Sequence, residues 1–186
     1  MSFQRMVKRP RISRRRLRCI ALATLIAVPP WARGDEPSRE NQIKAALVYK
    51  VVKFVEWPAD AVRDGELMFC AFGDSPVVAA LAGIEGRPVR AYRARFRRLE
   101  APTGEVARGC HVLYLAAGAG RDQTPVAPGA HATLTVGDSE DFVSRGGMVG
   151  LVNRGNRMSF EINLRAARAA GIRIAAPLLE LADVVE

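Results

Sequence analysis

The first regular hydrophobic spacing in the chain covers residues 38–55 and predicts an α-helix. Its apolar residues recur at intervals of three and four, which places them on one helical face: Ile43, Leu47, Val51 and Phe54, with Val48, Val52 and Val55 widening the arc. Ser38 is a candidate N-cap. Pro58 pushes Trp57 out of the helical region of backbone space, so we expect the helix to end before Trp57.

Three short apolar runs predict buried strands, at residues 66–72, 110–115 and 132–136. Their length, and the turn residues around them, favour strands over helices. The first run leads through the turn 73–76 into a helix that starts near Pro76, a residue suited to the first helical position. The arginine-rich segment 88–98 reads as an edge strand, because charges discourage pairing with other chains.

Strict alternation then predicts a β-hairpin over residues 148–164, with its turn at 153–156. The second strand alternates apolar residues with polar ones: Met158, Phe160, Ile162 and Leu164 with Ser159, Glu161 and Asn163. Around the hairpin we expect a short helix capped by Asp138 through Ser144, a helix capped by Asn163 and stopped by Gly171, a strand at 172–174, and a closing helix at 177–185.

These elements predict a three-layer α/β/α domain with a mixed, mainly parallel sheet and a C-terminal β-hairpin. With the segment 88–98 counted as the second strand, a doubly wound order with the first strand central makes the first strand, 66–72, and the third, 110–115, neighbours. That adjacency brings Cys70 and Cys110 within reach of a disulfide. The alternative is two buried free thiols that pack as small hydrophobic side chains.

Charge is distributed unevenly and divides the chain in two. Residues 1–34 hold nine of the 28 Lys and Arg residues and none of the 19 Asp and Glu residues, so residues 35–186 carry 19 of each. A basic start, the uncharged apolar stretch 19–32, and small residues before Asp35 are the parts of a cleavable signal peptide. An uncleaved anchor is the alternative, although 14 apolar residues are short for a membrane span.

We therefore expect a signal peptide at 1–34 and a single exported domain at 35–186. An oxidising compartment favours a disulfide between its two cysteines. Because the mature domain is electrically neutral, the charge argument for nucleic acid as a partner disappears.

Motifs for catalysis are missing from the sequence. It contains no P-loop, no dinucleotide-binding G-x-G-x-x-G and no nucleophile-elbow G-x-S-x-G. His111 and His131 do not have the spacing of a zinc site with the cysteines, and Glu161 has no acidic neighbour for acid–base work. We predict a protein that is not an enzyme and holds no metal or cofactor.

Two polar groups are candidate binding sites. Asp74 and Ser75 follow the first buried strand, where a small ligand could bind; helix capping is the plainer interpretation. The polar hairpin face of Ser159, Glu161 and Asn163, with Arg154 and Arg157 nearby, could bind a partner protein. A solvated strand face is the alternative there.

Three segments in fixed order resemble the YfiR family, periplasmic regulators of bacterial cyclic-di-GMP signalling. They are Lys44 to Pro58, which ends in F-x-x-W-P; Phe69 to Pro76; and Gly146 to Val152 with Phe160 to Asn163, followed by the Ala-Gly-Ile and Leu178 to Ala182 segments. The resemblance spans nearly all of residues 41–186. It adds Trp57 and Phe160 to the candidate partner- or ligand-binding residues.

The resemblance implies a periplasmic, non-catalytic protein that tends to form a homodimer. It implies binding to the periplasmic part of an inner-membrane diguanylate cyclase or another sensor, with an outer-membrane lipoprotein able to remove the regulator. Cys70 and Cys110 match positions that are paired in the family, whereas a second pair near the hairpin is absent here. A periplasmic small-ligand receptor that feeds a membrane sensor is the alternative function.

Overall fold

A computed structural model describes residues 38–101, 108–119, 132–155 and 157–185 of the chain. The predicted signal peptide at 1–34 and His131 lie outside the described residues, and the predicted signal peptide therefore stays a prediction. No helix in the described part of the chain is both long and apolar enough to cross a membrane.

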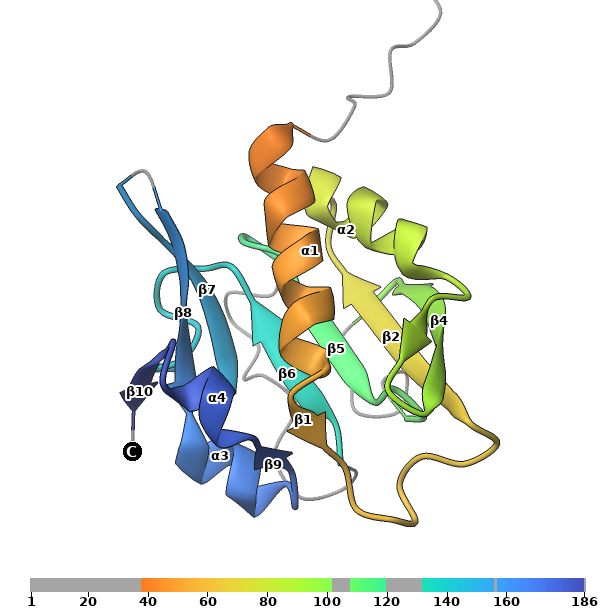
Figure 1. Cartoon of the computed structure of the whole chain (residues 1–186). Helices are drawn as coiled ribbons and strands as arrows, with labels where there is room; N and C mark the ends of the chain where they lie inside the picture. The colour runs from red at the N-terminus through yellow and green to blue at the C-terminus, as the bar shows by residue number, and fades with distance from the viewer. Residues whose placement is uncertain (1–37, 102–107, 120–131, 156, 186) are drawn as a thin grey trace, which may run out of the picture. The chain divides into compact units, whose positions relative to one another are not determined.

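The described residues form a mixed sheet of eight strands in the order β10-β8-β7-β6-β5-β2-β4-β3 (Figure 1). Strands β2, β4, β5, β6 and β7 run parallel to their neighbours along the centre, and β7–β8 and β3–β4 are antiparallel. The sheet strands are β2 (Glu66–Phe72), β3 (Pro88–Val89), β4 (Tyr92–Leu99), β5 (Val112–Leu115), β6 (Leu134–Gly137), β7 (Val149–Arg154), β8 (Arg157–Asn163) and β10 (Asp183–Val185).

Helices and one small strand pair complete the fold. Strands β1 (Val55–Glu56) and β9 (Arg173–Ile174) pair antiparallel outside the main sheet. The helices are α1 (Arg39–Val52), α2 (Pro76–Leu81), the 3-10 turn η1 (Ala82–Ile84), α3 (Leu164–Ala169) and α4 (Ala176–Leu179). The mixed α/β class and the C-terminal hairpin are confirmed.

Helix α1 forms where it was predicted but ends earlier, and it buries only part of the predicted apolar arc. The Ser38 hydroxyl accepts a hydrogen bond from the Asn41 amide, which confirms the N-cap. The helix ends at Val52 because Val55–Glu56 pairs with β9. Two members of that arc lie outside the core: Ile43 is 42% exposed and Phe54 is 38% exposed. The buried side of α1 consists of Ala45, Val48, Val51 and Val52.

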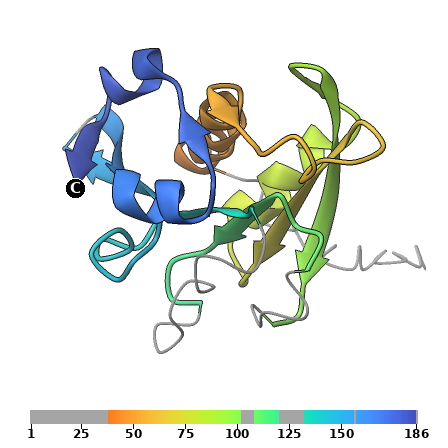
Figure 2. The same ribbon diagram turned by 90° about the horizontal axis from the view of Figure 1, so that it is seen from below.

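The core lies mainly between the sheet and the α1–α2 pair. Side chains of both helices share one buried cluster with residues of β2, β5, β6, β7 and β8, and Figure 2 shows α1 on one side of β5 and β6. A smaller cluster on the other face surrounds Cys70 and Cys110 and includes Phe142 and Val143 from the segment after β6. No helix covers this second face among the described residues, so the third layer of the prediction is not confirmed.

Three local predictions need correction. Residues 88–98 do not form one edge strand: the chain turns at Arg90, which has a positive φ of 52°, and β3 covers the edge of β4. Residues 139–144 form a bend and turns, not a helix, and Phe142 packs against Gly137 and Gly147, where no Cβ would fit. The closing helix stops at Leu179, and Asp183–Val185 instead pairs parallel with β8.

The predicted adjacency of the strands at 66–72 and 110–115 is confirmed. Strand β2 pairs with β5 and places Cys70 beside Leu113. Cys70 and Cys110 form a disulfide whose Cα atoms are 5.7 Å apart. A guanidinium nitrogen of Arg97 lies 3.3 Å from Cys110 Sγ and 3.7 Å from Cys70 Sγ, so the sulfur atoms sit under a cation at the sheet surface.

Candidate functional site

The polar face of the hairpin carries an ion-pair cluster that joins three strands. Arg154 Nη2 of β7 lies 3.2 Å from Glu161 Oε1 of β8 and 2.8 Å from Asp183 Oδ2 of β10. The side chains of Arg154 and Asp183 are both 57% exposed. Exposed ion pairs contribute little to stability. This cluster therefore presents charged hydrogen-bonding groups to solvent without being needed to hold the fold.

The other predicted hairpin residues have structural positions. Phe160 is 8% exposed and belongs to the main core, on the opposite face of β8 from Glu161. The Asn163 side chain accepts a hydrogen bond of 2.9 Å from the Ala166 amide and caps α3, as predicted. Ser159 of the predicted polar face is buried. Arg157 is exposed and is the cross-strand partner of Arg154, which forms an ion pair with Glu161.

Asp74 and Ser75 lie at a different place on the sheet, separated from β8 by β7, β6 and β5. Ser75 Oγ accepts from the Val77 amide at 3.2 Å and caps α2. Asp74 is fully exposed and forms an ion pair of 3.0 Å with Arg98. A cleft of about 910 Å³ opens beside them, lined by residues that follow β2, β4 and β5. Both polar side chains already have partners, which weakens their case as ligand groups.

Trp57 and His111 tie the loop before β2 to the ends of β2 and β5. Trp57 Nε1 donates to the His111 carbonyl at 3.2 Å. The Met68 amide donates to His111 Nδ1 at 2.8 Å, so Nε2 carries the proton and donates to the Ala61 carbonyl at 3.0 Å. Burial lowers the pKa of His111, although the Ala61 hydrogen bond opposes that effect. His111 therefore holds this loop through its hydrogen bonds, and it lines a cleft of about 570 Å³.

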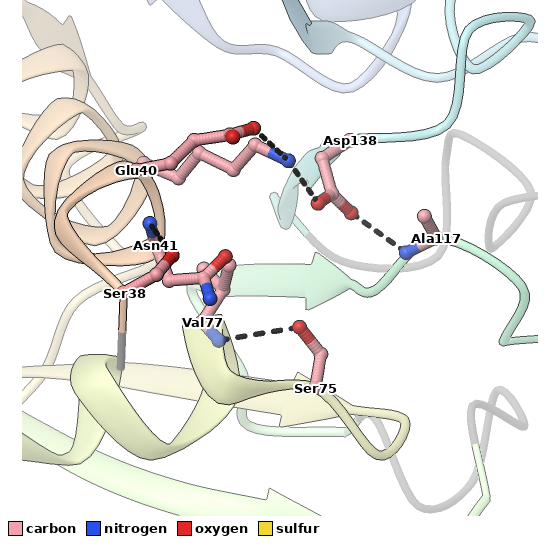
Figure 3. A network of polar contacts seen from close by, with 8 residues as sticks. Ser38, Glu40, Asn41, Ser75, Val77, Ala117 and Asp138 are labelled. Atoms are coloured by element: carbon pink, nitrogen blue, oxygen red, sulfur yellow. Dashed lines mark hydrogen bonds and ion pairs between the residues drawn. The ribbon is translucent and has the colours of Figure 1, made fainter. Parts of the chain in front are cut away.

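A buried ion pair that sequence analysis missed fixes α1 to the carboxyl edge of the sheet (Figure 3). Lys44 Nζ lies 3.1 Å from Asp138 Oδ2, and the Ala117 amide donates to Asp138 Oδ1 at 2.6 Å. The Asp138 side chain is only 5% exposed. Burial lowers the pKa of Lys44, but Asp138 and Glu40 outweigh it and raise the pKa overall. Nearby, burial and, to a lesser extent, the Asp138 carboxylate raise the pKa of the Tyr114 hydroxyl.

A sequence signal for this pair did exist. Lys44 is a positively charged residue next to the apolar face of α1 that packs on the sheet, and Asp138 directly follows the buried strand β6. We expected Asp138 to cap a helix, and only the fold brings it to Lys44, 94 positions away in the chain.

No group of three metal-ligating side chains occurs within the described ranges. The structure thus defines a class: a small mixed α/β domain with a disulfide, a hairpin at the sheet edge and an exposed charged cluster on it. The chain belongs to the YfiR/HmsC-like family, whose model matches residues 41–183. This family consists of periplasmic, non-catalytic regulators of cyclic-di-GMP signalling that are associated with membrane signalling proteins.

Proposed function

We propose that this protein binds the periplasmic part of an inner-membrane signalling protein, a diguanylate cyclase, and keeps it inactive. The observation that carries the proposal is the Arg154–Glu161–Asp183 cluster. Its three side chains come from three strands, so a rigid sheet presents them in a fixed arrangement. Charged groups arranged in this way give an interface its specificity and orientation.

Export by a cleavable signal peptide at 1–34, a homodimeric state, and release by an outer-membrane lipoprotein are parts of the same proposal. Membership of a periplasmic family supports export. Trp57, Phe160 and Asn163 would act indirectly in this function, because their side chains hold the loop before β2, the core and α3 in place.

The test measures cyclic-di-GMP in cells that lack the gene and are complemented with the full chain. The wild-type chain should lower the cyclic-di-GMP level, and Arg154→Glu should fail to lower it while accumulating normally in the periplasm. Arg168→Glu is the matched control, because Arg168 is an exposed arginine of α3. Equal repression by wild type and Arg154→Glu would refute the role of the cluster, and no repression by wild type would refute the function.

A small-ligand receptor is the second candidate, supported by the cleft of about 910 Å³ at the carboxyl ends of β2 and β4. Ligands bind at such edges in open α/β sheets. Arg98 lines this cleft. A metabolite that raises the melting temperature of the wild-type protein but not of the Arg98→Ala variant would support this candidate.

A further inference from the structure

The outward side of α1 carries a line of residues that are exposed or half-buried, of which Leu47 also packs against the main core. We call Ile43, Leu47, Lys50 and Phe54 the α1 seam; Phe54 lies in the turn just after the helix. Ile43 is 42% exposed, Phe54 is 38% exposed, and Leu47 is half-buried. In Figure 1, α1 lies in front of the sheet with its outer side free. Apart from Lys50 the seam is apolar, and its first three members lie on a helix with a capped N-terminus.

The spacing of the seam is that of a helix which packs against another helix. Its members follow one another at steps of four, three and four residues. This is the alternation of the a and d positions of a heptad, whose side chains insert between those of a facing helix. The buried face of α1 lies elsewhere, on Ala45, Val48, Val51 and Val52. The helix therefore has one face for its own core and a second face with the geometry for a partner helix.

Charge along the seam has a single sign. Arg39, Lys50 and Lys53 are exposed, and none of them pairs with a carboxylate in the described ranges. Lys53 Nζ instead lies 4.4 Å from the centre of the Tyr49 ring. Glu40, the acidic residue in the first turn of α1, forms an ion pair with Lys44. A helix that packs here with acidic residues along its edge would neutralise these cations, as residues beside a coiled-coil seam do.

We propose that the α1 seam docks an amphipathic helix of the regulated protein, with apolar residues on one side and acidic residues beside them. The inference rests on the proposed function and names the element of the partner that is recognised. A second copy of this chain is a poorer occupant, because two α1 seams would bring two cationic surfaces together. Like charges opposed in an interface weaken it.

Photo-crosslinking in cells tests the seam directly. The full chain carries p-benzoylphenylalanine at Ile43, at Arg157 on the hairpin, or at Arg95 as a control on the sheet face away from α1. The proposal expects adducts from position 43 with peptides of a membrane signalling protein that form an acidic amphipathic helix, and none from position 95. Peptide mapping by mass spectrometry should place the adducts every three or four residues along that helix.

Charge reversal gives the second measurement. Lys50→Glu together with Lys53→Glu should reduce the yield of the position-43 adduct by about tenfold or more, since opposed like charges replace attraction. Replacing the acidic residues of the crosslinked helix by lysine should restore the yield. Arg168→Glu, on an exposed position of α3, should leave the yield unchanged.

The outcomes separate this inference from the proposed function. Adducts from position 157 but none from position 43 would overturn the seam and leave the function standing. Absence of adducts from both positions would refute both. Adducts from position 43 with a second copy of this chain would assign the seam to self-association and overturn the proposal. If position 43 gives no protein adduct and the purified protein binds vesicles of phosphatidylglycerol and phosphatidylethanolamine, the seam is a membrane-binding surface and the proposal is likewise overturned.

Discussion

Lys44 Nζ lies 3.1 Å from the Asp138 carboxylate and links the first turns of α1 to the end of β6. The Asp138 side chain is 5% exposed and that of Lys44 is 16% exposed. Asp138 also accepts the Ala117 amide after β5. A single carboxylate therefore joins a helix and two strands at the carboxyl edge of the sheet.

Removing either charge of this pair should destabilise the fold. Asp138→Asn or Lys44→Met leaves the other charge buried without its partner, which costs about 3 kcal/mol. Urea denaturation followed by circular dichroism measures the loss. The double variant should lose less than the sum of the two single losses, because the two groups interact directly.

Glu40→Gln is the matched control for that cycle. Glu40 lies 3.4 Å from the same ammonium group, but its side chain is 52% exposed. Its removal should cost about 0.5 kcal/mol or less. A loss at Glu40 as large as that at Asp138 would show that burial is not what gives the Lys44–Asp138 pair its effect.

Stability should fall as the pH is lowered below about 6.5, in part because of His111. The pKa of His111 is lowered from its ordinary value of 6.5 because burial disfavours the charged ring. The neutral ring accepts the Met68 amide at Nδ1. Below pH 6.5 the unfolded chain binds the proton more readily than the folded chain does. The contribution of the neutral ring is therefore present above pH 6.5 and is lost between that pH and the lowered pKa.

His111→Gln isolates this contribution. The variant lacks the hydrogen bonds of the imidazole ring, so it should be less stable than wild type at pH 7.5. The difference in stability should shrink as the pH falls to 5, because the wild-type protein loses the contribution of the neutral ring. Urea midpoints measured across this range at constant salt give the result. A constant difference between the two proteins would contradict the role of the neutral ring.

The elements that could be predicted from the sequence are those whose neighbours are local. The hairpin follows from strict alternation between Met158 and Leu164, and the caps at Ser38 and Asn163 from residue type and position. What failed depends on distant contacts. Val184 forms part of a strand because it pairs with Ile162 of β8. Phe54 lies outside the helix, and its carbonyl accepts a hydrogen bond from the amide of Ala175.

The candidate site was predictable to a similar extent. Arg154 and Glu161 could be proposed from the hairpin, because the register of a short-turn hairpin places residues of known spacing on one face. Asp183, which completes the cluster, lies in a segment predicted as helix, and strand propensity outweighed that pattern once β8 provided an edge. The buried position of Phe160 follows from the same alternation.

Loss of the disulfide should cost more stability than any surface change. Cys70 and Cys110 are 40 residues apart in sequence, and closing a loop of this length stabilises by about 4 kcal/mol in the chain-entropy model. The Cys70→Ala/Cys110→Ala variant tests this by urea denaturation. Wild-type protein unfolded with and without reductant is the comparison, and equal midpoints for the two conditions would contradict the prediction.

Arg154 and Phe160 should separate function from stability within one hairpin. Arg154→Ala removes an exposed cluster and should lower the free energy of unfolding by less than about 1 kcal/mol. Phe160→Ala empties a core position on the opposite face and should cost about 3–5 kcal/mol.

If the hairpin face binds the cyclase, Arg154→Ala weakens repression in a protein that folds normally, whereas Phe160→Ala lowers repression only as far as it lowers the folded fraction. A ratio of repression to folded protein, measured for both variants in the same cells, distinguishes these cases. An equal ratio for both variants would assign the cluster a structural role only.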